Sequence, residues 1–266
     1  MWQLNIGLSL VSDTHGRVIE RMEEIKYSYE HFSSDEIAVI ILGDSGLNFW
    51  LNNNEKSKKE YLAKYGFRIY CVRGNHEERP ENLGYEIVYD ENVKGNVYLD
   101  PVNNKIRYFL DGGEYNINGH SVLTIGGAYS VDKHYRLARA GLSEETNDPK
   151  KSGWFNSEML TPNEMTQISM ATAGNHYDFV FTHTCPLSWE PTDLFLNFIN
   201  QSTVDKIMEI WLDSIKDNMT WSIWCFAHFH ADRIERPCVE QFYHAFQDLE
   251  VIWDYWNEYK ENSDFM

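Results

Sequence analysis

The chain has 266 residues and a formal net charge of −18, and its residues are 42% hydrophobic and 15% aromatic. This composition excludes a disordered chain, and the length allows one large domain with a sizeable core. The acidity disfavours a long nucleic acid as partner, because a strongly negative surface repels a phosphate backbone.

The first part of the chain alternates short apolar runs with segments of helical spacing. Strands are predicted over residues 5–12, 36–42 and 67–72, and the second is almost wholly apolar, as a strand buried on both faces should be. Residues 18–31 and 52–65 have helical spacing. The resulting strand–helix–strand–helix–strand order predicts a parallel sheet covered by helices.

The pattern changes after the third strand. Residues 84–127 resemble short strands joined by hairpin turns, with turn signals such as Asp111-Gly112-Gly113 and Asn118-Gly119. Residues 129–165 are polar with little periodicity, and we interpret them as a lid or insertion, since long irregular segments in compact domains are commonly functional.

The remainder predicts buried strands over residues 178–182 and 220–227, a helix over 193–217 and a strand-like run over 241–253. No repeat or linker divides the sequence, so we expect a single α/β domain over residues 1–266. The short run Lys56-Ser57-Lys58-Lys59 lies on a predicted helix and is interpreted as a solvated face.

A polar cluster follows directly on each of several predicted strands. Because ligands in open α/β sheets bind at the carboxyl ends of strands, we expect these clusters to converge. In D-x-H and H-x-H, residues two apart on an extended chain point the same way, so both can reach one site. The clusters are Asp13-Thr14-His15, Gly43-Asp44, Arg73-Gly74-Asn75-His76-Glu77, His183 and His228-Phe229-His230.

The donor types indicate the metal. Carboxylate and amide oxygens with imidazole nitrogens, and no cysteine, suit Mn²⁺, Fe or Zn²⁺. They are too many for one catalytic ion that keeps an open position. Two divalent transition-metal ions, Mn favoured, would instead clamp the attacking and leaving oxygens at phosphorus. The predicted ligands are Asp13, His15, Asp44, Asn75, His183, His228 and His230; surface or core roles are expected for His31, His120, His176 and His244.

The order D-x-H, G-D, G-N-H-E, H, H-x-H between residues 13 and 230 resembles the calcineurin-like metallophosphoesterases. The resemblance implies a two-sheet sandwich flanked by helices. It implies one metal held by Asp13, His15 and His230, another held by Asn75, His183 and His228, and Asp44 bridging them. It also implies that His76 stabilises the transition state or protonates the leaving oxygen, with Glu77 orienting it.

Three features refine the resemblance. Ala227 replaces the glycine of the family's usual G-H-x-H. The D-R-G of the protein Ser/Thr phosphatases is absent after Gly43-Asp44, whereas Arg73 matches their R-G-N-H-E, so half of their phosphate clamp is expected. The stretch that begins at Gly126-Gly127 and includes Trp154-Phe155 resembles a branch found in bacteria and phages.

The implied activity is hydrolysis of a phosphoester, as a phosphodiesterase or phosphatase, by metal-activated hydroxide attack on phosphorus. A small phosphodiester or nucleotide is the favoured substrate. A phosphoprotein Ser/Thr phosphatase is the alternative, which the missing D-R-G disfavours. A catalytically inactive metal-binding scaffold is disfavoured because all ligands and His76 are present. A two-metal amidohydrolase usually opens with H-x-H on its first strand, unlike this chain.

The predicted lid carries cations in an otherwise acidic chain. We expect Lys133, His134 or Arg136 to hold a phosphate oxygen, because an acidic rim would repel an anionic substrate. Trp154 or Phe155 is expected to stack on an aromatic part of the substrate.

Location follows from what the sequence lacks. The start, Met1 to Asn5, has no basic region or cleavage site, and no apolar run approaches the ~20 residues that span a bilayer. The cysteines have no paired spacing, so we expect reduced thiols. We therefore predict a cytoplasmic protein without a membrane partner.

Overall fold

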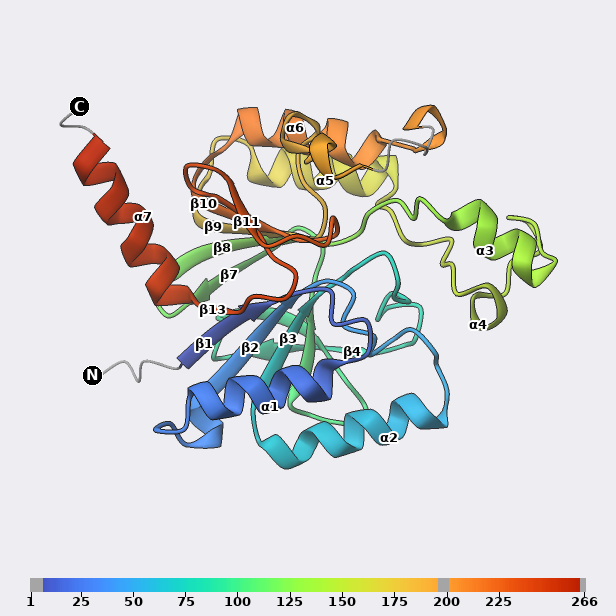
Figure 1. Cartoon of the computed structure of the whole chain (residues 1–266), viewed down its shortest axis with the longest axis horizontal. Coiled ribbons are helices and arrows are strands. Elements are labelled where there is room, and N and C mark those ends of the chain that lie inside the picture. The colour runs from blue at the N-terminus through green and yellow to red at the C-terminus, as the bar shows by residue number, and fades with distance from the viewer. Residues whose placement is uncertain (1–6, 196–200, 264–266) are drawn as a thin grey trace.

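A computed structural model describes residues 7–195 and 201–263. Two mixed sheets face each other between layers of helices (Figure 1), which confirms the predicted fold class. The first sheet has seven strands in the order β13-β1-β2-β3-β6-β5-β4. Its strands β1, β2, β3 and β6 are parallel neighbours. The bounds are β1 Gly7–Val11, β2 Ile37–Leu42, β3 Arg68–Val72, β4 Glu86–Asp90, β5 Gly95–Leu99, β6 Ile106–Phe109 and β13 Gln247–Asp248.

The second sheet has six strands in the order β11-β12-β10-β9-β8-β7. Strands β8, β9, β10 and β12 are parallel, and β7 and β11 pair antiparallel at the two edges. The predicted hairpins are present as β4–β5, β5–β6 and β7–β8. The bounds are β7 Gly113–Ile117, β8 His120–Ile125, β9 His176–Thr182, β10 Thr220–Phe226, β11 Arg233–Arg236 and β12 Val239–Gln241.

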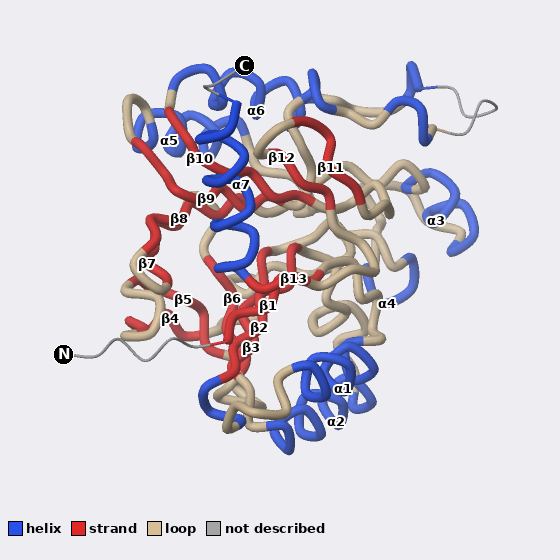
Figure 2. The backbone as a smooth tube through the Cα atoms, turned by 60° about the vertical axis from the view of Figure 1, so that its left-hand side comes forward, coloured by secondary structure: helices blue, strands red, loops and turns tan. Residues whose placement is uncertain are grey.

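The helices cover the outer faces of the sandwich (Figures 1 and 2). Helices α1 and α2 lie on the first sheet, and α5 and α6 lie on the second. Helices α3 and α4 stand at the opposite end of the molecule from the start of β1 and from α7. The bounds are α1 Val18–Ser28, α2 Asn53–Leu62, α3 Lys133–Ala140, α4 Pro149–Ser152, α5 Pro162–Thr172, α6 Ile207–Asn218 and α7 Leu249–Ser263. Single 3₁₀ turns are Ser34–Glu36, Ala63–Tyr65, Leu187–Trp189, Thr192–Leu194 and Gln201–Thr203.

The core explains the apolar runs. Leu10, Ile40 and Tyr70 of the first sheet pack in one cluster with Phe179 and Phe181 of the second. Residues that alternate with these, such as Val39 and Ile41, pack outward with residues of α1 and α2. Each central strand is therefore buried on both faces, and the two sheets bury each other's inner surface.

The prediction of a strand-like run over residues 241–253 is largely wrong, because only Gln241, the last residue of β12, and β13 at Gln247–Asp248 are strand. Helix α7 begins at Leu249, and Leu249, Ile252 and Trp256 are buried at helical spacing. The helix predicted over 193–217 is the shorter α6 preceded by single turns, and its residues 196–200 lie outside the described part of the chain.

The expected irregularity of residues 129–165 is also corrected, because α3, α4 and the start of α5 lie there. The local signals were present in the sequence. Asp148 caps α4 through Lys150 N with Pro149 in the first turn. Thr161 and Glu164 form a capping box at the start of α5.

The prediction of a solvated helix face over residues 56–59 is wrong for Lys59. Its side chain is buried, and its Nζ lies 2.7 Å from Asp100 Oδ2 and donates to Asn48 Oδ1 at 2.8 Å and Tyr85 Oη at 2.9 Å. One lysine thus joins α2 to the loops after β2, before β4 and after β5. Within residues 7–195 and 201–263, no helix has the length and apolar character required to cross a membrane.

Replacing Lys59 by methionine should lower the free energy of unfolding by about 3–5 kcal/mol, because it leaves the Asp100 carboxylate buried without its cation. Chemical denaturation measures the change. Lys56→Met, on the exposed face of the same helix, is the control and should stay within about 0.5 kcal/mol of the parent. Equal stability of the two variants would contradict this role.

Candidate metal centre

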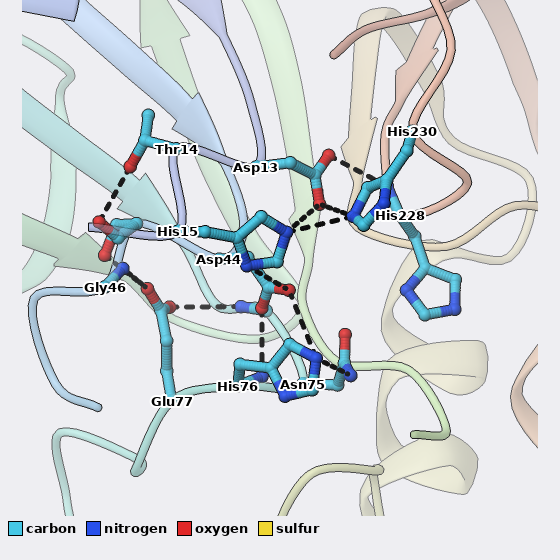
Figure 3. A network of polar contacts seen from close by, with 12 residues as sticks. Asp13, Thr14, His15, Asp44, Gly46, Asn75, His76, Glu77, His228 and His230 are labelled. Atoms are coloured by element: carbon cyan, nitrogen blue, oxygen red, sulfur yellow. Dashed lines mark hydrogen bonds and ion pairs between the residues drawn. The ribbon is translucent and has the colours of Figure 1, made fainter. Parts of the chain in front are cut away.

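The polar clusters after β1, β2, β3 and β10 meet at one edge of the sandwich (Figure 3), and His183 after β9 lies beside Asn75 and Asp44 at the same edge. Backbone hydrogen bonds join the first two loops: Asp13 N donates to Gly43 O at 3.1 Å, and His15 N donates to Asp44 O at 2.9 Å. The convergence follows from the parallel order of the strands, whose carboxyl ends lie at the same edge.

One group of donors consists of Asp13, His15 and His230, whose ligand atoms lie within 4.8 Å of one another. The Nε2 atoms of His15 and His230 are 2.9 Å apart, and Asp13 Oδ1 lies 3.7 Å from His230 Nε2. Asp13 Oδ1 is buried and has no hydrogen-bond partner in the described part of the chain. Burial, together with nearby Asp44, raises the pKa of Asp13 well above its usual range. A bound cation would stabilise the ionised carboxylate and would contact the oxygen that has no hydrogen-bond partner.

A second group lies deeper. His183 Nε2 is 2.9 Å from Asn75 Oδ1 and 3.7 Å from Asp44 Oδ1, and the His228 ring lies 5.1 Å from the His183 ring. His183 Nδ1 donates to Leu42 O at 2.8 Å. That bond places the ring proton on Nδ1 and leaves the Nε2 lone pair facing the site, as a metal ligand requires.

Asp44 lies between the two groups. Its Oδ2 is 3.8 Å from His15 Nδ1, and its Oδ1 is 3.7 Å from His183 Nε2. Burial opposes ionisation of this carboxyl, but the imidazoles of His76, His183 and His15 keep its pKa well below the usual range. A carboxylate with one oxygen toward each group is suitably placed for the bridging role that the resemblance implies.

The backbone at this edge is strained. Asp13, His15, Asp44, His228 and His230 all have positive φ values, between 42° and 71°. Such residues cost of order 1–3 kcal/mol each and cluster at functional sites. The prediction that extended D-x-H and H-x-H segments aim the side chains is therefore wrong in mechanism, although both pairs reach the site. Left-handed turns aim them instead.

Two glycines are required by close packing. A Cβ on Gly43, which has φ +95°, would lie 2.0 Å from His183 Nδ1. A Cβ on Gly74 would lie 2.0 Å from Asp44 Oδ1. The glycines of the G-D and G-N-H-E motifs thus let the ligands approach the neighbouring backbone.

The side chain of Asn75 is held by two residues that sequence analysis did not identify, Ser130 and Glu158. Its Nδ2 donates to Ser130 Oγ at 2.8 Å, and Ser130 Oγ donates to Glu158 Oε2 at 2.5 Å. All three residues are buried. The chain of bonds fixes the amide so that Asn75 Oδ1 faces His183. The capping pattern of α5 was the nearest sequence signal, but no local pattern identifies Glu158.

Glu77 does not orient His76 in this structure. It accepts from Ser45 Oγ, from Gly46 N at 3.1 Å and from Gly74 N at 3.1 Å, so it joins the loops after β2 and β3. Burial, with the nearby Asp44 charge, raises the pKa of Glu77 to about 7. His76 is held instead through its backbone N, which donates to Asp44 Oδ1 at 2.9 Å.

Arg73 is placed differently from the predicted phosphate clamp. Its guanidinium is buried and pairs with Asp111 Oδ2 at 2.9 Å. It also donates to Glu158 O at 2.7 Å. These hydrogen bonds occupy the guanidinium N–H groups and join the end of β3 to the segment that contains Glu158. The guanidinium is therefore not placed to bind a phosphate. We therefore assign it a structural role.

The three predicted lid cations separate. Arg136 lines the space beside the ligands, with Nη2 3.4 Å from His76 Nε2. Lys133 pairs with Glu144 at 2.8 Å and lies over the Trp154 ring, and His134 is exposed on α3. Phe155 is fully buried against Phe49, so Trp154 and Phe155 serve packing rather than substrate stacking.

Three cavities adjoin the predicted ligands in the described part of the chain. One, of about 500 Å³, borders Asp13 and His15 on the side of Arg17 and His244. The other two border Asp44 and His76. The larger of these two, of about 480 Å³, extends over Tyr129, Leu194, Phe195, Glu209 and Phe229. The smaller, of about 110 Å³, is lined by Gly16, Gly46, Phe49 and Trp50. The last two cavities are both lined by His15, Asp44, His76 and Arg136.

A sandwich of this topology with Asp, Asn and His side chains at its carboxyl edge has the donor set of a divalent-metal protein. The calcineurin-like phosphoesterase family model matches residues 9–232, and the chain belongs to that family. The family uses divalent metal ions to hydrolyse phosphoesters, and the groups around Asp13 could hold such ions. No curated protein matches the chain. The placement in a bacterial and phage branch stays a prediction.

Gly43→Ala should weaken metal binding by about 10- to 100-fold, because the new methyl group displaces the His183 ring from its bond to Leu42 O. Metal titration followed by elemental analysis measures this. Gly174→Ala is matched, since Gly174 has φ +76° but no atom near the new Cβ, and it should keep parental metal content. Full occupancy in Gly43→Ala would show that the ring position is not critical.

Proposed function

We propose that this protein is a two-metal phosphodiesterase that acts on a small diester. The supporting observation is that His15, Asp44, His76 and Arg136 line both the larger and the smaller cavity. A phosphodiester bound at the ligands has two organic substituents, and each would have a cavity of its own. A monoester would leave one of them unused.

The metal ligands of the proposal are the two groups that share Asp44. Asp13, His15 and His230 would hold one ion, and Asn75, His183 and His228 the other. When bound, the ions, with Mn²⁺ favoured, would activate water and neutralise charge on the phosphoryl oxygens. Asp44 would fix the two groups relative to each other. Its carboxylate faces the imidazoles of His15 and His183 and accepts from the His76 backbone N.

His76 and Arg136 would act on the substrate. Burial lowers the pKa of His76, although the Asp44 charge partly opposes this, so the ring is mainly neutral at neutral pH. In the structure His76 Nε2 accepts from Arg136 Nη2; with substrate bound, the neutral ring would instead donate a hydrogen bond to a substrate oxygen. Arg136 is preorganised by Asp132, 2.7 Å from Nε, and by Gly153 O, 3.0 Å from Nη1. Its Nη2 remains directed at the cavity side of His76.

Charge supports a small substrate. The chain carries a net charge of −18, so a cation inside the site is needed to attract an anion past an acidic surface. Lys206 also lines the larger cavity, where its Nζ is paired with Glu190 at 2.6 Å. Arg136 is paired with Asp132 through Nε only, so its Nη2 still faces His76 and the cavity. This leaves Arg136 as the principal phosphate contact, and we propose neither long nucleic acid nor membrane as partner. The structural role of Arg73 further disfavours the phosphoprotein phosphatase.

The decisive experiment compares bis(p-nitrophenyl) phosphate with p-nitrophenyl phosphate on Mn²⁺-loaded protein. The diester should have the higher kcat/KM, and chelation should abolish its hydrolysis.

Trp50→Ala should lower the diester-to-monoester ratio of kcat/KM by about tenfold, because it opens the smaller cavity that holds the second substituent. Tyr27→Ala, an exposed aromatic on α1, is the control. A parental preference for the monoester would refute the diesterase assignment.

Arg136→Ala should lower kcat/KM for the diester by about 10- to 100-fold, the usual loss for one charge-assisted contact to phosphate. Steady-state kinetics at saturating Mn²⁺ measures the effect. Lys133→Ala is the matched control. It removes another cation of the same helix, one that pairs with Glu144. Equal kinetics in the two variants would remove Arg136 from the site.

A further inference from the structure

The part of the larger cavity beside His228 is lined mainly by apolar side chains and one buried glutamate. We define the Phe229 subsite as Phe195, Val204, Glu209 and Phe229, all of which line that cavity. Resting on the proposed function, we infer that this subsite binds a nucleoside arm of the diester, with its base stacked on Phe229 and its exocyclic amine bonded to Glu209.

The aromatic side chains suit a planar group. The Phe195 and Phe229 rings are nearly parallel, at 26°, with centroids 6.0 Å apart. Phe229 also contacts His228, at 5.0 Å between ring centroids, so the aromatic surface adjoins a predicted metal ligand. A base stacks on such a surface with little dependence on its identity, because every base has a π-face. Stacking alone would therefore select a planar arm.

Glu209 supplies the selectivity. Its side chain is 4% exposed and lines the cavity, yet its Oε2 has no hydrogen-bond partner among the residues described. Its Oε1 accepts from Thr184 Oγ1 at 2.7 Å. Because Thr184 follows His183 directly, the carboxylate is fixed relative to the ligands. A buried acceptor without a donor is unfavourable, and a ligand N–H would satisfy it.

The same residues exclude other occupants. A second phosphate would meet the Glu209 carboxylate, while Lys206, 5.1 Å from the Phe195 ring centroid, is already paired with Glu190. A purely hydrocarbon arm would leave Glu209 Oε2 unpaired. A neutral heteroaromatic ring with an amine fits both the aromatic faces and the acceptor, and a nucleobase such as adenine has this chemistry.

The test uses two substrates that differ by one group: the p-nitrophenyl esters of adenosine 5′-phosphate and of purine riboside 5′-phosphate, which lacks the amine. Burial raises the pKa of Glu209 to about 7, so assays at pH 8.5 keep it an ionised acceptor. Mn²⁺-loaded protein should prefer the adenosine ester by about tenfold in kcat/KM, the value of one charge-assisted hydrogen bond.

Glu209→Gln should bring that ratio to about one or below. The Thr184 hydroxyl would donate to the amide oxygen and turn the NH₂ group toward the subsite, where it faces the substrate amine. Phe229→Leu should lower kcat/KM for both esters by about tenfold relative to bis(p-nitrophenyl) phosphate. Glu240→Gln is the matched control, because Glu240 is an equally buried glutamate bonded to Trp256, and it should keep the parental ratio.

The outcomes separate the two proposals. Hydrolysis of bis(p-nitrophenyl) phosphate with an ester ratio near one in the parent would overturn the subsite and leave the diesterase intact. If no diester is hydrolysed, the proposed function fails. The subsite is then judged by calorimetric Kd values of adenosine and purine riboside 5′-monophosphates on Mn²⁺-loaded protein, where a ratio near one also overturns it.

Discussion

Two carboxylates buried at the same edge of the sandwich are the constraint on which the site depends. Asp13 and Asp44 are each nearly inaccessible to water, and the charge of Asp44 raises the cost of ionising Asp13. Buried charge of this kind is tolerated only when it is compensated. The surrounding imidazoles compensate Asp44, but Asp13 Oδ1 has no hydrogen-bond partner in residues 7–195 and 201–263. A cation is the natural complement, so the architecture around these two residues is that of a metal protein.

The local distortions follow from this convergence. The predicted ligands follow β1, β2 and β3 of one sheet and β9 and β10 of the other, and they must reach one point from these strand ends. Left-handed turns at the ligand residues achieve that, and glycines at positions 43 and 74 let His183 and Asp44 approach the backbone. Each turn is unfavourable locally. The inter-sheet core, which packs both sheets into one unit, holds the turns in place.

The sequence predicted the parts that depend on local pattern. Apolar runs located β2, β3, β9 and β10, and the polar residues directly after them proved to share one edge. Arg73, Glu77 and Lys59 could not be placed that way, because their partners Asp111, Gly46 and Asp100 come from other segments. For the same reason, motif position alone suggested a phosphate clamp where the fold needs a buried cross-link. Helix α7 was missed because its apolar residues also fit a strand.

The segment from 129 to 165 contributes to the site in two ways. Through Ser130 and Glu158 it fixes the Asn75 amide, and through Arg136 it supplies a cation next to His76. Arg73 ties the same segment to the end of β3 by donating to Glu158 O. The segment is therefore anchored at the point where it contacts the ligands. An element so anchored is a wall of the site, and the position of Arg136 is coupled to the geometry of the predicted metal ligands.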